Sequence, residues 1–91
     1  MNPEEAKEYA KTNLEAYLNA KGINTSSNFS CLNPAHEDKH PSMSFDSRRN
    51  RCHCFSCGID YDIFDVVAID TGLSGKELFN HVYSLYNISV D

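Results

Sequence analysis

The sequence predicts an α+β domain in which a small antiparallel sheet follows one helix and precedes two more. Three observations support this prediction. Apolar residues recur at helical spacing near both ends, short runs in the middle alternate as strands do, and the chain has only 91 residues. Such a chain forms one small domain, residues 1–91, whose hydrophobic core alone supplies little stability. A bound metal ion is a common additional source of stability in domains of this size.

The first predicted element is a single helix over residues 3–21. Asn2 can cap its first turn, and Pro3 suits the first helical position. Two glutamates then follow at the positive end of the helix dipole. Gly22 ends the helical pattern. The apolar face of this helix consists of Ala6, Ala10, Leu14, Tyr17 and Leu18.

We predict a ribbon of short strands in the middle of the chain, over residues 29–58. Apolar and polar residues alternate around Phe29, around Met43 and around Cys52. The polar residues 46–50 separate the last two runs, so we expect a hairpin there. Gly58 ends this region.

Two helices are predicted after the ribbon, over residues 62–71 and 74–86. Asp62 can cap the first of them, and Gly72 ends it. Ser74 and Glu77 have the spacing of a capping box at the start of the second helix.

Two pairs of metal-binding residues lie in the predicted ribbon. Cys31 and His36 form a Cys-x4-His pair, and 17 residues separate it from the Cys-x2-Cys pair. Cys54 and Cys57 form that second pair. This spacing is typical of a four-coordinate structural zinc site in which each of two knuckles supplies two ligands. Four protein ligands leave no position for a reactive water, so we expect one structural Zn²⁺ and no hydrolytic centre.

Other interpretations of the cysteines are weaker. Two disulfides would suit a secreted domain, but the chain begins Met-Asn-Pro-Glu-Glu without an apolar signal segment. A redox Cys-x-x-Cys would need a strand–helix–strand context, and a deaminase-type zinc would need His-x-Glu before Pro-Cys-x-x-Cys. Neither pattern is present. Cys52 competes for the metal because, two residues before Cys54, its side chain points to the same face of a strand.

Charge and hydropathy restrict the function classes further. No apolar run approaches the ~18 residues needed to cross a bilayer, and thiols held as metal ligands suit a reducing cytoplasm. The net charge is −5, distributed as −1 over residues 1–35, +1 over 36–58 and −5 over 59–91. The ribbon is therefore the least acidic part, although the chain lacks the strongly basic character of a typical nucleic-acid-binding domain.

Taken together, these motifs resemble the zinc-binding domain of bacterial-type DNA primases. That family has Cys-Pro-x-His, then Glu-Lys-x-Pro-Ser, then His-Cys-Phe-Gly-Cys-Gly and a helix entered through an acidic stretch. The resemblance covers roughly residues 29–86. The corresponding segments here are residues 31–36 (CLNPAH), 38–42 (DKHPS) and 53–58 (HCFSCG), followed by 63–66 (IFDV) and 72–74 (GLS).

The chain departs from the family pattern at several positions. Four residues instead of two separate Cys31 from His36, and Met43 replaces a phenylalanine after Pro-Ser. Ser56 and Tyr61 each replace a glycine. These differences resemble primases of phages or mobile elements. The resemblance also places Cys52 where a tyrosine is usual and assigns Cys54 to the zinc, which implies that Cys52 is a small buried apolar residue.

The resemblance implies that the chain recognises single-stranded template DNA for RNA primer synthesis. Catalysis in that family lies in a separate polymerase domain, so we expect this chain alone to be a binding module and not an enzyme. Single-strand binding uses cations along phosphates and exposed rings on which bases stack. The candidates for these two roles are Lys39, Arg48, Arg49 and Arg51 for phosphates, and Phe45 and Phe55 for stacking.

Two alternatives stay open at this stage. The arginines of the predicted turn would equally suit a solvated surface, and both phenylalanines would equally suit the small core. The chain would also suit a zinc ribbon that contacts a protein, such as a replicative helicase or the primase polymerase domain. The acidic C-terminal helices favour this last interpretation because they repel a phosphate backbone.

Overall fold

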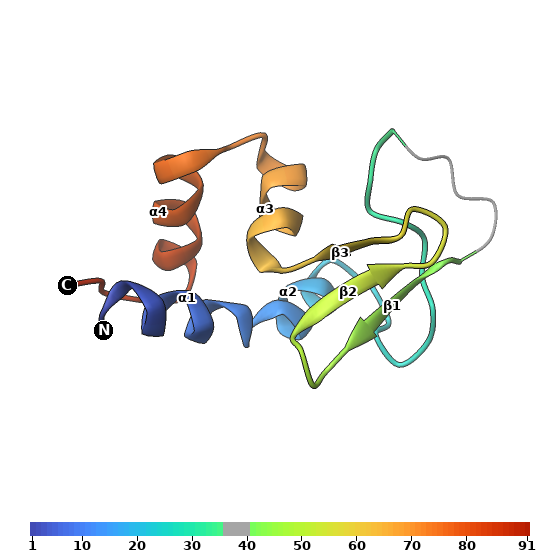
Figure 1. Cartoon of the computed structure of the whole chain (residues 1–91), viewed down its shortest axis with the longest axis horizontal. Coiled ribbons are helices and arrows are strands. Elements are labelled where there is room, and N and C mark those ends of the chain that lie inside the picture. Colours follow the sequence, from blue (N-terminus) through green and yellow to red (C-terminus); the bar gives the residue numbers. More distant parts are fainter. Residues whose placement is uncertain (36–40) are drawn as a thin grey trace.

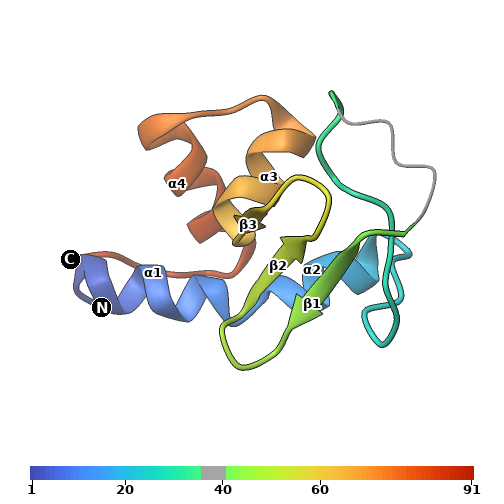
Figure 2. The ribbon, with the colours of Figure 1, turned by 45° about the vertical axis from the view of Figure 1, so that its right-hand side comes forward.

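The computed structural model describes residues 1–35 and 41–91 and confirms the predicted α+β class (Figure 1). Figures 1 and 2 show the sheet at one end of the molecule and the two C-terminal helices at the other, with the N-terminal helices running along both. In chain order the elements are α1 (Pro3–Lys11), α2 (Leu14–Ala20), β1 (Met43–Asp46), β2 (Arg51–Cys54), β3 (Ile59–Tyr61), α3 (Ile63–Thr71) and α4 (Gly75–Leu85).

The single helix predicted over residues 3–21 is instead two helices, interrupted at Thr12 and Asn13. The hydroxyl of Thr12 donates to the carbonyl oxygen of Tyr9 at 2.6 Å, and the Asn13 amide donates to the same oxygen at 3.1 Å. Short polar side chains that bond to backbone groups compete with the helical ladder in this way. The start was predicted correctly, since the Asn2 side chain accepts from the Glu5 N–H at 2.8 Å.

The sheet has three antiparallel strands in the order β1-β2-β3. The predicted turn over residues 46–50 does join two paired strands, in which Met43 lies opposite Cys54. Asn50 closes the turn with a positive φ of 51°, a conformation that asparagine tolerates. The third strand, Ile59–Tyr61, was not predicted. Phe29 forms only an isolated bridge with Met43 and belongs to no strand.

One hydrophobic core joins the sheet to the helices. Leu14 and Leu18 of α2, Met43 of β1, and Val66 and Val67 of α3 are fully buried. They belong to one cluster of contacting residues that reaches α4 at Val82. The face of the sheet that carries Met43 and Cys54 therefore packs on the helices, and the opposite face is left towards solvent.

The two C-terminal helices begin where the sequence predicts. Asp62 accepts from the Asp65 N–H at 3.1 Å and Asp65 accepts in return from the Asp62 N–H at 3.0 Å, which completes a capping box. Gly72 ends α3 in the left-handed conformation. Ser74 is the N-cap residue of α4, but the predicted capping box is wrong because its side chain makes no capping hydrogen bond. Within the described residues, no helix has the length and apolar character to cross a membrane.

Candidate metal centre and exposed sheet face

The hairpin and the Phe29–Met43 bridge bring the two cysteine knuckles together. Phe29 and Met43 exchange two backbone hydrogen bonds, of 2.8 and 2.9 Å, which hold the segment before Cys31 against β1. On the other side, the Gly58 N–H donates to the Cys54 carbonyl at 2.8 Å and closes the second knuckle. Gly58 has a φ of +69°, which a glycine adopts without strain.

The sulfur atoms of Cys31, Cys54 and Cys57 all lie within 4.8 Å of one another. The Sγ atoms of Cys31 and Cys57 are 3.6 Å apart. Two thiolates bound at ~2.3 Å to one tetrahedral zinc ion would lie about 3.8 Å apart. The spacing of these donors therefore fits a zinc ion, and soft thiolates are the ligands that zinc prefers over harder divalent cations.

The surroundings of Cys54 favour its thiolate form. Burial opposes ionisation, but hydrogen bonds from the Ser42 hydroxyl, the Cys57 N–H and the neighbouring thiols lower the pKa of Cys54 to about 6. Burial and the two nearby sulfurs raise the pKa of Cys57 to about 12. The negative charge of one thiolate thus opposes ionisation of the next, and a bound cation would remove that opposition.

Cys52 lies outside this cluster. It is fully buried among apolar residues of the core, and burial raises its pKa to about 12. This placement agrees with its interpretation as a small buried residue. His36 and Lys39, predicted as the fourth zinc ligand and as a phosphate contact, lie outside the described residues.

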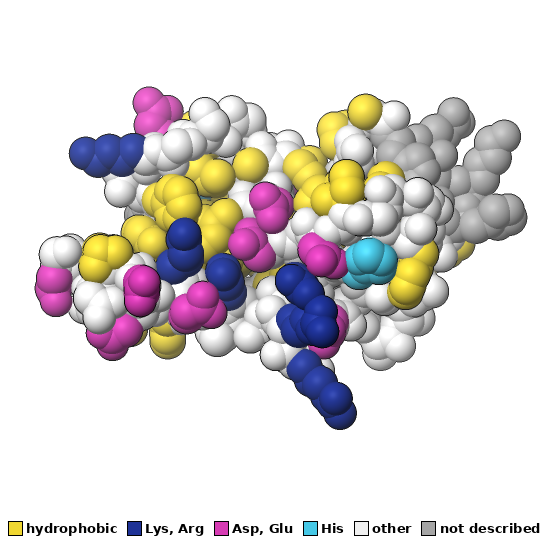
Figure 3. Space-filling view, viewed as in Figure 1, with side chains coloured by type: hydrophobic (Ala, Val, Ile, Leu, Met, Phe, Trp, Pro, Cys, Tyr) yellow, Lys and Arg dark blue, Asp and Glu magenta, His cyan; other side chains and the backbone are white. Residues whose placement is uncertain are grey.

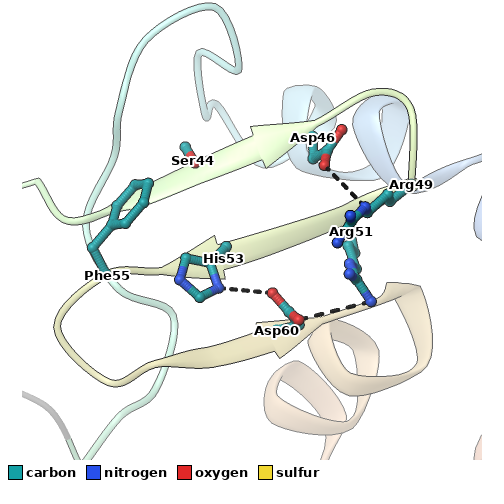
Figure 4. A pocket seen from close by; sticks show the side chains of 7 residues that line it. All are labelled: Ser44, Asp46, Arg49, Arg51, His53, Phe55 and Asp60. Atoms are coloured by element: carbon teal, nitrogen blue, oxygen red, sulfur yellow. Dashed lines mark hydrogen bonds and ion pairs between the residues drawn. The ribbon is translucent and has the colours of Figure 1, made fainter.

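The solvent face of the sheet carries a hollow of about 330 Å³ (Figure 4). Side chains on this face alternate with the buried ones, as the pleat of a strand requires. His53 lies opposite Ser44 on one side and Asp60 on the other. The residues that line the hollow are Ser44, Asp46, Arg49, Arg51, His53, Phe55 and Asp60.

The predicted phosphate-binding arginines differ in their surroundings. Figure 3 shows basic side chains gathered at the β1–β2 turn. Arg49 lies 3.9 Å from an oxygen of Asp46, and Arg51 lies 3.7 Å from an oxygen of Asp60. Arg48 is exposed and makes no ion pair with the described part of the chain.

The two predicted stacking rings lie on opposite faces. Phe55 is 65% exposed at the edge of the hollow, with its ring centroid 5.0 Å from that of His53 in an edge-to-face arrangement. Phe45 is half-buried against the core on the other face of the sheet. Among the predicted residues, the structure thus brings Phe55 together with Arg49 and Arg51 and separates Phe45 from them.

Asp60 is a prominent residue of this face that sequence reasoning did not single out. Its Oδ1 lies 2.8 Å from His53 Nδ1, and the hydrogen bond from His53 and the charge of Arg51 lower its pKa. Because an ionised carboxylate only accepts hydrogen bonds, His53 Nδ1 carries the shared proton. The signal was available in principle, since a third strand over 59–61 places Asp60 opposite His53.

Comparison with known proteins identifies relatives of this chain. Residues 12–91 match the family described as the CHC2 zinc finger. The DNA primase of Campylobacter jejuni is 34% identical over 77 residues, which make up 85% of this chain and 12% of that protein. The DNA primases of Enterococcus faecalis and Listeria innocua are 34% and 33% identical over 64 residues, 70% of this chain and 10% of each primase. No solved structure matches.

Proposed function

This chain belongs to the CHC2 zinc-finger family of DNA primases, and on this premise we propose that it is a zinc-stabilised module that holds single-stranded template DNA for primer synthesis. It spans only about a tenth of the length of the curated primases it matches. We therefore assign nucleotide joining to a polymerase domain that works with this module, and no catalytic residue to these 91 residues.

The observation that carries the zinc site is the convergence of Cys31, Cys54 and Cys57, whose sulfur atoms lie within 4.8 Å of one another. His36 is proposed as the fourth ligand from its place in the Cys-x4-His pair. Zinc bound in this way joins the two knuckles, and its binding energy becomes folding energy. A closed site of four protein ligands acts structurally and leaves chemistry to the partner domain.

The solvent face of the sheet is the proposed template surface. Bases of an unpaired strand stack on exposed rings, each contributing ~1–3 kcal/mol, while nearby cations contact the phosphates. The exposed Phe55 lies at one end of the hollow and the basic turn after β1 lies at the other, so both elements are on the same face of the sheet. Phe45 is left out of the proposed surface because it packs against the core.

Titration of the zinc-loaded chain with single-stranded oligonucleotides at several salt concentrations tests this function. The acidic C-terminal region opposes phosphates, so we expect weak binding by the isolated chain, near 10⁻⁴ M at physiological salt. Covalent linkage to a primase polymerase domain should tighten it through effective concentration. The proposal fails if neither the isolated nor the linked chain binds an oligonucleotide in a salt-dependent way.

A second candidate function is contact with a replication protein, such as a helicase or the polymerase domain. The observation that favours it is a mainly apolar hollow of about 270 Å³ between α1 and α4, lined by Phe79 and Tyr83 of α4 and by Pro3, Glu4 and Lys7 of α1. An apolar patch is visible at this place in Figure 3. Affinity for such a partner would change little with salt, whereas phosphate binding weakens steeply as salt rises.

A further inference from the structure

The hollow on the solvent face of the sheet is balanced in charge. Its two arginines, Arg49 and Arg51, face two carboxylates, Asp46 and Asp60. Each arginine lies within 4 Å of its own carboxylate, at 3.9 Å and 3.7 Å. A phosphate placed here would meet two negative charges as well as two positive ones, so the hollow suits a neutral group with hydrogen-bonding edges better than an anion.

An aromatic wall completes this hollow. Phe55 is 65% exposed, and the ring of His53 packs edge-to-face with the Phe55 ring. Figure 4 shows Phe55 at one end of the hollow, His53 between Phe55 and Asp60, and Arg51 on the far side of Asp60. A planar heteroaromatic group that stacks on Phe55 and extends past His53 would therefore direct its polar edge towards Asp60 and Arg51.

Asp60 favours a bound group whose polar edge carries hydrogen-bond donors. The His53 and Arg51 contacts keep the carboxylate ionised, so it can accept hydrogen bonds but cannot donate one. A carboxylate offers about four acceptor positions, and each oxygen of Asp60 keeps one after the contacts with its two neighbours. Its side chain is 42% exposed, which leaves the remaining positions accessible from the hollow.

We propose that this hollow binds one unpaired base of the template and that Asp60 selects bases with an exocyclic amino group. Cytosine, adenine and guanine each offer such a donor to a carboxylate. Thymine and uracil carry a carbonyl oxygen where cytosine has its amino group, and the carboxylate repels that oxygen; their one donor on this edge, N3–H, lies between two carbonyl oxygens. The proposal rests on the proposed template-binding function and adds to it the class of base that is preferred.

Cytosine and uracil provide the sharpest comparison. Both are pyrimidines of nearly equal size, so they stack similarly, and they differ at position 4 by an amino group or a carbonyl. The zinc-loaded chain is titrated with single-stranded octamers of deoxycytidine, of deoxyuridine and of abasic residues. We expect the deoxycytidine octamer to bind about tenfold more tightly than the deoxyuridine octamer, as the lower end of the range for one added hydrogen bond to a charged group implies.

Three variants assign the preference to its source. Asp60→Asn keeps the shape but adds a donor, and should bring the deoxycytidine and deoxyuridine affinities within about twofold of each other. Phe55→Ala should lower the affinities for the deoxycytidine and deoxyuridine octamers to that for the abasic octamer. Arg48→Ala, outside the hollow, is the control: it should weaken all three octamers and leave their ratio unchanged. Equal zinc content and circular dichroism show that each variant is folded.

The outcomes separate the two levels of the proposal. Equal binding of the deoxycytidine and deoxyuridine octamers by the wild-type chain, or a preference that persists in Asp60→Asn, overturns the role of Asp60. Template binding itself stands in either case. Failure of every octamer to bind, alone or with a linked polymerase domain, overturns the template-binding function and with it this inference.

Discussion

The Sγ atoms of Cys31 and Cys57 lie 3.6 Å apart although 26 positions separate these residues in the chain. This contact joins the segment before the sheet to the knuckle that follows β2. Cys54, at the end of β2, completes the group. The ends of the ribbon thus meet at three sulfur atoms, and a cation bound there would connect them directly.

Removal of zinc should unfold the ribbon and leave part of the N-terminal helical signal. The sheet has only three short strands, and apolar burial in a chain of this size supplies a small net stability. Circular dichroism before and after addition of a chelator measures the change. If the metal-free chain keeps its full signal and a cooperative thermal transition, zinc does not supply the folding energy.

Cys52→Ala should keep the zinc and lower stability by about 1 kcal/mol. The Cys52 side chain is fully buried in the core, so its loss leaves a small cavity. Urea unfolding of the zinc-loaded variant gives the free energy of unfolding, and metal analysis gives its zinc content. Loss of zinc from Cys52→Ser together with retention of zinc by His36→Ala would show that the fourth ligand is Cys52.

Disruption of the contact between α2 and Asp70, at the end of α3, should reduce stability. Lys21 Nζ lies 2.6 Å from one oxygen of Asp70, and the Tyr17 hydroxyl donates to the other at 2.7 Å. The side chains of Lys21 and Asp70 are 30% and 27% exposed, so solvent screens this ion pair in part and we expect Lys21→Ala to cost up to about 1 kcal/mol. Chemical unfolding of the zinc-loaded chain measures this.

The same contact should make stability depend on pH. Burial opposes ionisation of Asp70, but the bonds from Lys21 and Tyr17 lower its pKa below the unfolded value of about 4. The folded state therefore gains stability above that value and loses it as the pH falls through the lower folded pKa. Asp70→Asn should remove this part of the acid dependence, and an unchanged acid profile would contradict the assignment.

The basic turn should contribute to DNA binding through salt-dependent contacts. Replacement of Arg48, Arg49 and Arg51 together by alanine should reduce the salt slope by up to about three charges. Arg48→Ala alone should account for about one charge, and this should be most of the loss seen in the triple variant, because Arg49 and Arg51 already face carboxylates. Oligonucleotide titrations across a salt series check both values. A triple variant with the wild-type slope would make the turn a solvated surface and favour the protein-contact function.

The general plan of the fold could be predicted because its signals are local. Asn2, Asp62 and Gly72 mark helix ends through capping and backbone preferences, and the polar residues between Asp46 and Asn50 mark the hairpin. The break at Thr12 and Asn13 was missed because the apolar residues keep their helical spacing across it. The break arises from hydrogen bonds of these two side chains to the Tyr9 carbonyl oxygen, which compete with the helical backbone bonds. Strand β3 was missed because three residues are too short to show a period.

The two sites differ in how far they could be predicted. The cysteine spacing indicated the cluster directly, and the structure places three of the four predicted ligands within reach of one ion. The arrangement of the sheet face depends on which residues lie opposite one another across strands. Only the register shows that Asp60 meets His53 and Arg51, and that Phe45 and Phe55 lie on different faces.

The zinc content of the purified chain and its ligand variants tests the central claim most directly. Mass spectrometry of the native chain and elemental analysis should give one zinc ion per chain. Cys31→Ser, Cys54→Ser and Cys57→Ser should each lose the metal and the folded ribbon, while Cys52→Ala should retain both. A wild-type chain without zinc, or a Cys57→Ser variant that binds zinc as the wild type does, would contradict the account.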